Sequence, residues 1–146
     1  MTRNFLAAFA ALALALVGGA RADTSSPVGI WLTEAQTAHV EIAPCGQALC
    51  GSIVWLKEPL DAAGTPKRDV NNPDETRRAR ALLGMNLLEG FVPASGGGWD
   101  RGTIYNPEDG KTYKCVMAFE DDGRLKVRGY FGVPLLGKTQ LWTRVR

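Results

Sequence analysis

A repeated alternation of apolar and polar residues, in short segments that end at turns, constrains the fold more than any other feature of the sequence. It is clearest in residues 125–131, where one face carries Leu125, Val127, Gly129 and Phe131 and the other carries Lys126, Arg128 and Tyr130. A period of two is that of a β-strand with one buried face. Turn sequences such as Asp121-Asp122-Gly123 separate this segment from the next. We therefore expect an all-β protein.

Similar segments recur along most of the chain. Further strands are expected at residues 28–33, 38–43, 51–56, 103–106, 112–120 and 138–145. The run at 51–56 is almost continuously apolar, which predicts a strand buried on both faces. One short helix is expected from Asn72, with Pro73 in its first turn, to Gly84. Short strands with regular turns predict a small closed antiparallel barrel of about eight strands. Such an interior is either filled by side chains or holds one small ligand, and the pattern leaves both open.

The first residues have the pattern of a secretory signal peptide. Arg3 precedes an uncharged apolar run at residues 5–17, and Ala20-Arg21-Ala22 is a cleavage site of the A-x-A type. We expect residues 1–22 to be removed, leaving residues 23–146 as one domain. The apolar run is shorter than the roughly 20 residues of a membrane span, so no membrane anchor is expected. The predicted location is periplasmic or secreted.

Charge argues against nucleic acid as a partner. Removal of residues 1–22 takes away Arg3 and Arg21, which lowers the number of Lys and Arg residues from 17 to 15 and so matches the 15 Asp and Glu residues. A neutral domain has no general electrostatic attraction to nucleic acid or anionic lipid. The sequence does not identify a protein partner.

Three cysteines have unequal expected roles. Cys45 and Cys50 lie between two strand segments, where a disulfide would close a hairpin and stabilise it by about 2 kcal/mol. Cys115 remains, either as a reactive or intermolecular thiol or as a small buried apolar residue. Its place on an apolar strand face favours burial.

No catalytic or metal-binding motif is recognisable. His39, the single histidine, lies on the polar face of a strand without a local nucleophile motif, and no cofactor or metal is expected. The aromatic residues are the richest feature, since in a small barrel they either form the core or line a pocket. Two arginines of the expected helix are candidates to contact an anionic group. The candidate ligand-binding residues are Trp55, Tyr105, Tyr113, Tyr130, Arg77 and Arg80.

Several short motifs occur together in a characteristic order. They are Gly29-Ile30-Trp31, Cys45-Gly46, Cys50-Gly51, Asp69, Asn72-Pro73, Ile104-Tyr105-Asn106-Pro107, Asp109-Gly110-Lys111-Thr112-Tyr113 and Gln140-Leu141-Trp142-Thr143-Arg144. In this order the chain resembles the secreted bacterial proteins of the domain of unknown function 2147 family. The resemblance implies a lipocalin-like barrel and a periplasmic or secreted location, and it implies no activity. The Gly-x-Trp opening is similar to that of lipocalins. It implies structural roles for Trp31 and Trp142 and a cation–π contact between Trp31 and Arg144.

These observations leave three functional hypotheses. The first is a protein that binds a small, partly apolar ligand inside the barrel, at the end opposite Trp31. In this reading the long loop at residues 57–71 and the arginines would contact an anionic head group. The second is a structural or interaction protein with a filled core that acts through its surface. The third is an enzyme of unknown reaction, for which the sequence offers no motif.

Overall fold

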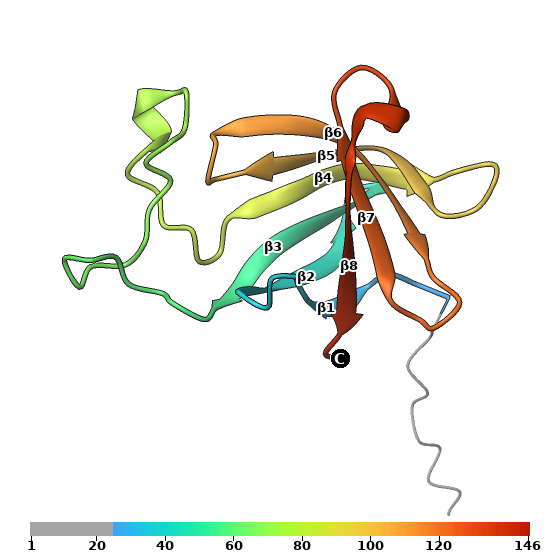
Figure 1. Ribbon diagram of the computed structural model, residues 1–146, viewed down its shortest axis with the longest axis horizontal. Coiled ribbons are helices and arrows are strands. Elements are labelled where there is room, and N and C mark those ends of the chain that lie inside the picture. The colour runs from blue at the N-terminus through green and yellow to red at the C-terminus, as the bar shows by residue number, and fades with distance from the viewer. Residues whose placement is uncertain (1–24) are drawn as a thin grey trace, which may run out of the picture.

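The computed structural model describes residues 25–146, which form a closed antiparallel β-barrel (Figure 1). The expected signal peptide lies outside the described residues. Each of the eight strands pairs with its neighbour in sequence, and the last pairs with the first. The strands are β1 Gly29–Leu32, β2 Ala38–Cys45, β3 Ala48–Leu56, β4 Asn86–Pro93, β5 Trp99–Asn106, β6 Lys111–Phe119, β7 Leu125–Tyr130 and β8 Lys138–Arg144.

The seam between β1 and β8 closes the barrel and removes the free strand edges. Trp31 lies opposite Arg144, and Leu32 lies opposite Thr143. Because β1 is short, the seam is extended by a side chain: the Glu34 carboxylate accepts a hydrogen bond from the backbone N–H of Leu141 at 3.2 Å.

The up-and-down order gives the barrel two different ends. The connections β2–β3, β4–β5 and β6–β7 lie at one end, which we call the closed end. The other four, β1–β2, β3–β4, β5–β6 and β7–β8, lie at the opposite end, which we call the open end. The long β3–β4 connection, residues 57–85, extends away from the barrel wall (Figure 1).

Side chains fill the barrel interior. The core consists of Trp31, Val40, Ile42, Ile53, Met85, Leu87, Leu88, Phe91, Cys115, Met117, Leu125, Val127 and Trp142. Two glycines show how closely it is packed. A Cβ atom on Gly51 would lie 2.8 Å from Cδ1 of Leu88, and one on Gly102 would collide with the ring of Phe91. Large side chains therefore occupy the space that glycines leave on neighbouring strands.

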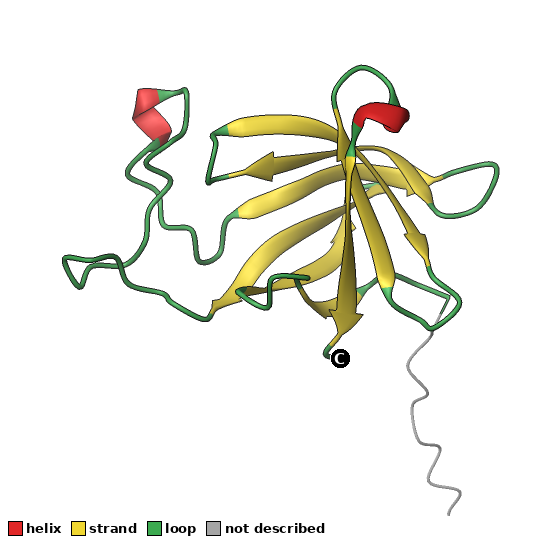
Figure 2. Cartoon of the chain, viewed as in Figure 1, coloured by secondary structure: helices red, strands yellow, loops and turns green. Residues whose placement is uncertain are grey.

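The expected helix is absent from the structure. Between residues 72 and 84 the chain forms a single 3-10 turn, η1 (Glu75–Arg77), and a second such turn, η2 (Pro134–Leu136), precedes β8 (Figure 2). Asp74, not Asn72, caps η1 by accepting from the N–H of Thr76. The segment has too little apolar surface to stabilise a helix by packing, because η1 contains no buried residue.

The prediction for residues 51–56 is also wrong in part. Ile53 is buried, but Val54 and Trp55 are exposed. A register irregularity between His39 and Val40 places Trp55 opposite His39 on the outer wall. The strand is therefore covered on one face only at this point.

The three cysteines behave as the spacing predicts. Cys45 and Cys50 form a disulfide across the β2–β3 hairpin, with their Cα atoms 5.7 Å apart. Cys115 is free and buried. Burial raises the pKa of its thiol to about 12, so it stays protonated at neutral pH.

Candidate functional site

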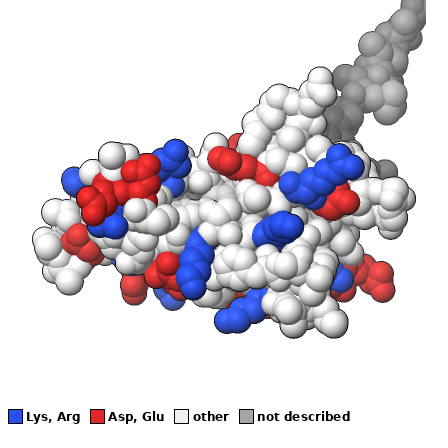
Figure 3. All heavy atoms as spheres, turned by 90° about the horizontal axis from the view of Figure 1, so that it is seen from above, with Lys and Arg blue, Asp and Glu red and all other residues white. Residues whose placement is uncertain are grey.

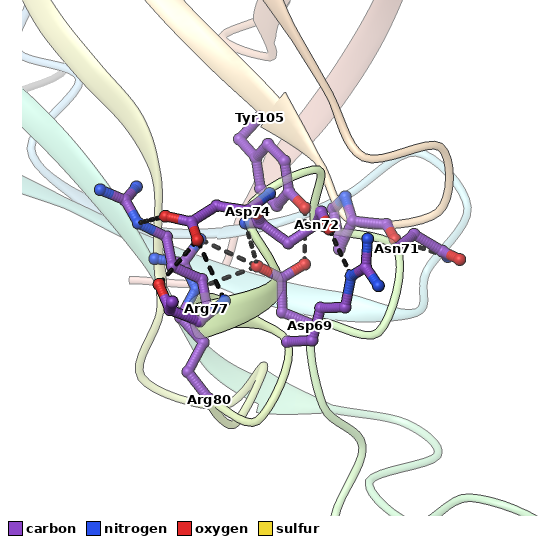
Figure 4. A network of polar contacts seen from close by, with 10 residues as sticks. Asp69, Asn71, Asn72, Asp74, Arg77, Arg80 and Tyr105 are labelled. Carbon is purple, nitrogen blue, oxygen red and sulfur yellow. Dashed lines mark hydrogen bonds and ion pairs between the residues drawn. The ribbon is translucent and has the colours of Figure 1, made fainter.

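A buried carboxylate organises the open end of the barrel. Asp69, in the β3–β4 connection, is fully buried and accepts three side-chain hydrogen bonds (Figure 4). Tyr105 Oη on β5 donates at 2.6 Å, Asn72 Nδ2 at 2.7 Å and Arg80 Nε at 3.0 Å. A second nitrogen of Arg80 lies 3.0 Å from the same carboxylate oxygen as its Nε. Both oxygens of the carboxylate are thus engaged by groups of this chain.

The protonation states of this network follow from its contacts. Burial alone would raise the pKa of Asp69, but the hydrogen bonds from Tyr105, Asn72 and Arg80 outweigh it and hold that pKa below its usual range. Burial, together with the neighbouring Asp69 carboxylate, raises the pKa of Tyr105 to about 12. Tyr105 is therefore a permanent hydrogen-bond donor and Asp69 a permanent anion at neutral pH.

The network braces the β3–β4 connection against the barrel. Asn71 Nδ2 donates to the backbone carbonyls of Pro107 and Glu108 in the β5–β6 turn, at 3.0 and 3.1 Å. The chains approach so closely that a Cβ on Gly110 would collide with the carbonyl of Asn71. Asn72 also accepts from the N–H of Asp74. We call Asp69, Asn71, Asn72, Arg80 and Tyr105 the Asp69 brace, and its geometry is that of a structural clamp.

The two candidate arginines of the connection already have carboxylate partners. Arg77 pairs with Asp74 at 3.3 Å, and Arg80 pairs with Asp69. Lys/Arg and Asp/Glu side chains accordingly alternate around this part of the surface (Figure 3). An anionic ligand at Arg77 or Arg80 would have to compete with these internal pairs.

Two aromatic rings meet at the entrance to the barrel at its open end, which we call the mouth. The rings of Tyr113 and Phe131 lie 4.4 Å apart, and Phe131 is 53% exposed. Tyr113 lies opposite the half-buried Ile104, and its hydroxyl donates to the carboxylate of Asp109. This hydrogen bond lowers the pKa of Asp109 and raises that of Tyr113. The mouth therefore presents an apolar aromatic face next to a fixed anion.

The structure separates the predicted aromatic residues instead of gathering them. Tyr113 lies at the mouth, and Tyr105 belongs to the Asp69 brace. Trp55 lies on the outer wall, 40% exposed, with its ring 4.4 Å from that of His39. Tyr130 is half-buried on β7, opposite Lys114. Ligand binding by these residues stays a prediction.

The closed end is sealed by tryptophan and arginine. The Arg144 guanidinium lies 4.3 Å from the centre of the Trp31 ring. Its nitrogens donate to the carbonyls of Val28 at 3.0 Å and Ser26 at 2.7 Å. Trp142 is buried in the same core as Trp31. These contacts tie both chain ends of the barrel to one hydrophobic plug.

Within residues 25–146, two hollows lie on the barrel's outside. One borders the end of the β3–β4 connection at Arg80, Met85 and Glu89, and the other lies beside the disulfide at Glu41 and Ser52. In this part of the chain no three His, Cys, Asp or Glu side chains are grouped to hold a metal ion. The same residues include no helix long and apolar enough to cross a membrane.

The β7–β8 connection carries an exposed apolar surface that the sequence reasoning missed. Leu135 is 86% exposed, Leu136 75% and Val133 53%. We call these three side chains the apolar tip. The signal was present in the sequence as apolar residues in a loop, where polar turn residues are the rule.

Comparison with known proteins agrees with this geometry. A solved structure described as "Protein HP1028 from the human pathogen Helicobacter pylori belongs to the lipocalin family" is similar, with a TM-score of 0.72 and 25% sequence identity over 83% of this chain and 84% of that chain. No curated protein matches the sequence. The model of a family described as uncharacterised proteins conserved in bacteria matches residues 29–144. The chain therefore belongs to this family, DUF2147, and has a lipocalin-like barrel.

Proposed function

We propose that this protein is an exported, non-enzymatic binding protein that holds a small, partly apolar ligand at the mouth of its barrel. The observation that carries the proposal is the pair formed by the half-buried Tyr113 ring and the exposed Phe131 ring above a filled core. An aromatic surface beside a few fixed polar groups is the usual composition of a small-molecule site. The lipocalin-like fold is compatible with this role, although a fold alone does not establish one.

Export is supported by two independent features. The first residues have the composition of a signal peptide. The Cys45–Cys50 disulfide is typical of proteins that fold in an oxidising compartment. Together they favour the periplasm or the extracellular space.

The filled interior favours a site at the mouth over a deep cavity. Trp31, Trp142 and Phe91 occupy the core. A ligand could therefore enter the half of the barrel near the closed end only by displacing large side chains. Close-packed cores resist such displacement. Lys138 is an exposed cation at the mouth, where it lies opposite the inward-facing Gly129. It takes part in none of the ion pairs found among residues 25–146. Lys138 is therefore a better placed contact for an anionic head group than Arg77 or Arg80.

A second candidate function is an interaction protein that acts only through its surface. The packing around Gly51 and Gly102 favours it, because a barrel without space for a ligand serves as a rigid scaffold. The two candidates differ in whether a small molecule binds at all.

Calorimetric titration with dodecanoate separates them. We expect weak, saturable binding to the wild-type protein and a loss of roughly tenfold or more in affinity for Phe131→Ala, because the exposed ring supplies apolar contact. Trp55→Ala, which removes an exposed aromatic residue from the outer wall, is the matched control and should bind as the wild type does. If dodecanoate and other single-chain amphiphiles give no heat with the wild type, the surface-interaction function is the better account.

A further inference from the structure

The apolar tip has a geometry that the mouth site does not require. Figure 1 shows the β7–β8 connection projecting beyond the strands that carry it. From Phe131 to Leu136 the sequence is Phe-Gly-Val-Pro-Leu-Leu, so no side chain in this run forms hydrogen bonds. Three neighbouring apolar side chains exposed at a projection mark an interaction surface, unlike single exposed apolar residues.

Part of the tip's backbone is hydrogen-bonded from within the chain. Arg128 Nε donates to the carbonyl of Pro134 at 2.7 Å, and a terminal nitrogen of Arg128 donates to the carbonyl of Leu135 at 3.3 Å. The N–H of Leu136 donates to the carbonyl of Val133 at 3.1 Å. Pro134 has no N–H to satisfy. These contacts pair the carbonyls of Val133, Pro134 and Leu135, which lowers the cost of removing them from water.

Cations and a tyrosine lie at the base of the tip. Lys138 begins β8, and Lys114 and Tyr130 lie opposite each other on β6 and β7. Both lysines are exposed. Asp109, a fixed anion at the mouth, is engaged by Tyr113 and by the N–H of Lys111. Long basic side chains and tyrosine behind an apolar tip match the order of layers in a bilayer, with lipid phosphates above hydrocarbon.

We propose that the apolar tip docks into the interface of a lipid bilayer that contains anionic phospholipid. Val133, Leu135 and Leu136 enter the boundary between head groups and acyl chains, while Lys114 and Lys138 contact lipid phosphates. A protein partner is less well matched, because a protein interface combines an apolar centre with a hydrogen-bonding polar rim, whereas the tip itself carries only apolar side chains. Attachment is peripheral and reversible, since so small an apolar surface gives weak binding.

Vesicle flotation tests the proposal directly. The wild-type protein, without its signal peptide, should float with vesicles of mixed phosphatidylcholine and phosphatidylglycerol and bind less to pure phosphatidylcholine. Leu135→Ser/Leu136→Ser should lower the partition coefficient roughly tenfold or more. Lys114→Gln/Lys138→Gln should reduce binding to the anionic vesicles and leave the weak binding to pure phosphatidylcholine unchanged.

The control uses two exposed leucines elsewhere in the chain. Leu60 and Leu83, 51% and 52% exposed in the β3–β4 connection, are changed to serine in Leu60→Ser/Leu83→Ser, which should float as the wild type does. Circular dichroism confirms that each variant is folded. The proposal is wrong if the wild type floats with neither vesicle or if the tip variant floats as well as the wild type. It is also wrong if the tip instead joins two copies of the chain in solution. The tip variant should still bind dodecanoate as the wild type does, because the mouth site does not include the tip. Failure of the membrane proposal would therefore leave the proposed mouth site unaffected.

Discussion

The two ends of the barrel are built by different physical means. At the closed end, large apolar side chains and one stacked arginine form a plug. At the open end, hydrogen bonds and ion pairs around Asp69 hold an irregular connection in place, and apolar side chains remain exposed. Apolar burial specifies a shape but leaves no surface for binding. A polar brace holds a loop in position while leaving neighbouring side chains accessible, so we place function at the open end.

Removal of the plug should have the largest effect on stability. Trp31→Ala deletes a fully buried ring together with its contact with Arg144, and should lower the free energy of unfolding by about 3–5 kcal/mol. Urea denaturation of the variant measures the change. A midpoint equal to that of the wild type would mean that the closed end is not the stabilising half of the barrel.

Loss of the Asp69 brace should cost less and act locally. Asp69→Asn keeps the size of the side chain but removes the negative charge that Tyr105 and Arg80 contact. It should lower the free energy of unfolding by about 2–3 kcal/mol. Hydrogen exchange should be accelerated more strongly in residues 57–85 than in β1 and β8. Uniform acceleration along the whole chain would contradict the division into two ends.

Acid should release the same brace. The pKa of Asp69 is lowered in the folded state, so its ionised form contributes stability that is present above its unfolded pKa and is lost as pH falls through the lower folded value. The wild type should therefore lose stability below about pH 4 more steeply than Asp69→Asn. Because Asp61, Asp74, Asp109 and Asp122 titrate in both proteins, the difference between their unfolding curves isolates Asp69. Parallel curves would show that Asp69 does not stabilise the fold by its charge.

Reduction of the disulfide should have a smaller effect. The Cys45→Ser/Cys50→Ser variant lacks the link across the β2–β3 hairpin and should lose about 2 kcal/mol. Cys115 should react with a thiol reagent only after denaturation, because it is buried and its pKa is raised. Rapid reaction of the native protein would place Cys115 outside the core.

The smallest effect is expected on the outer wall. Trp55→Ala breaks an exposed ring contact with His39, which should cost about 1 kcal/mol or less. Thermal unfolding compared with that of Trp31→Ala tests the contrast between two tryptophans only a few strands apart. Equal losses would mean that Trp55 is part of the core.

The sequence predicted the barrel because strand alternation is a local property. It missed β4, where Leu87 and Leu88 are adjacent and both buried, because two neighbouring buried residues interrupt the alternation by which a strand is recognised. It predicted a helix after Asn72 because Asn72 and Pro73 resemble the start of a helix. In the structure the Asn72 side chain instead contacts Asp69 and Asp74. The Asp69–Tyr105 hydrogen bond joins residues 36 positions apart, and no local pattern encodes such a contact. The register irregularity that turns Trp55 outward is likewise a product of strand pairing.

The central claim is that a ligand binds at the mouth, above a filled barrel. Nuclear magnetic resonance during a dodecanoate titration tests it most directly, since signals from both ends are seen at once. We predict shifts of the Tyr113 and Phe131 ring signals and of the Ile104 methyl signals, with the indole N–H signals of Trp31 and Trp142 unchanged. Shifts of the Trp31 or Trp142 indole signals would show that the ligand enters the interior and would contradict the account.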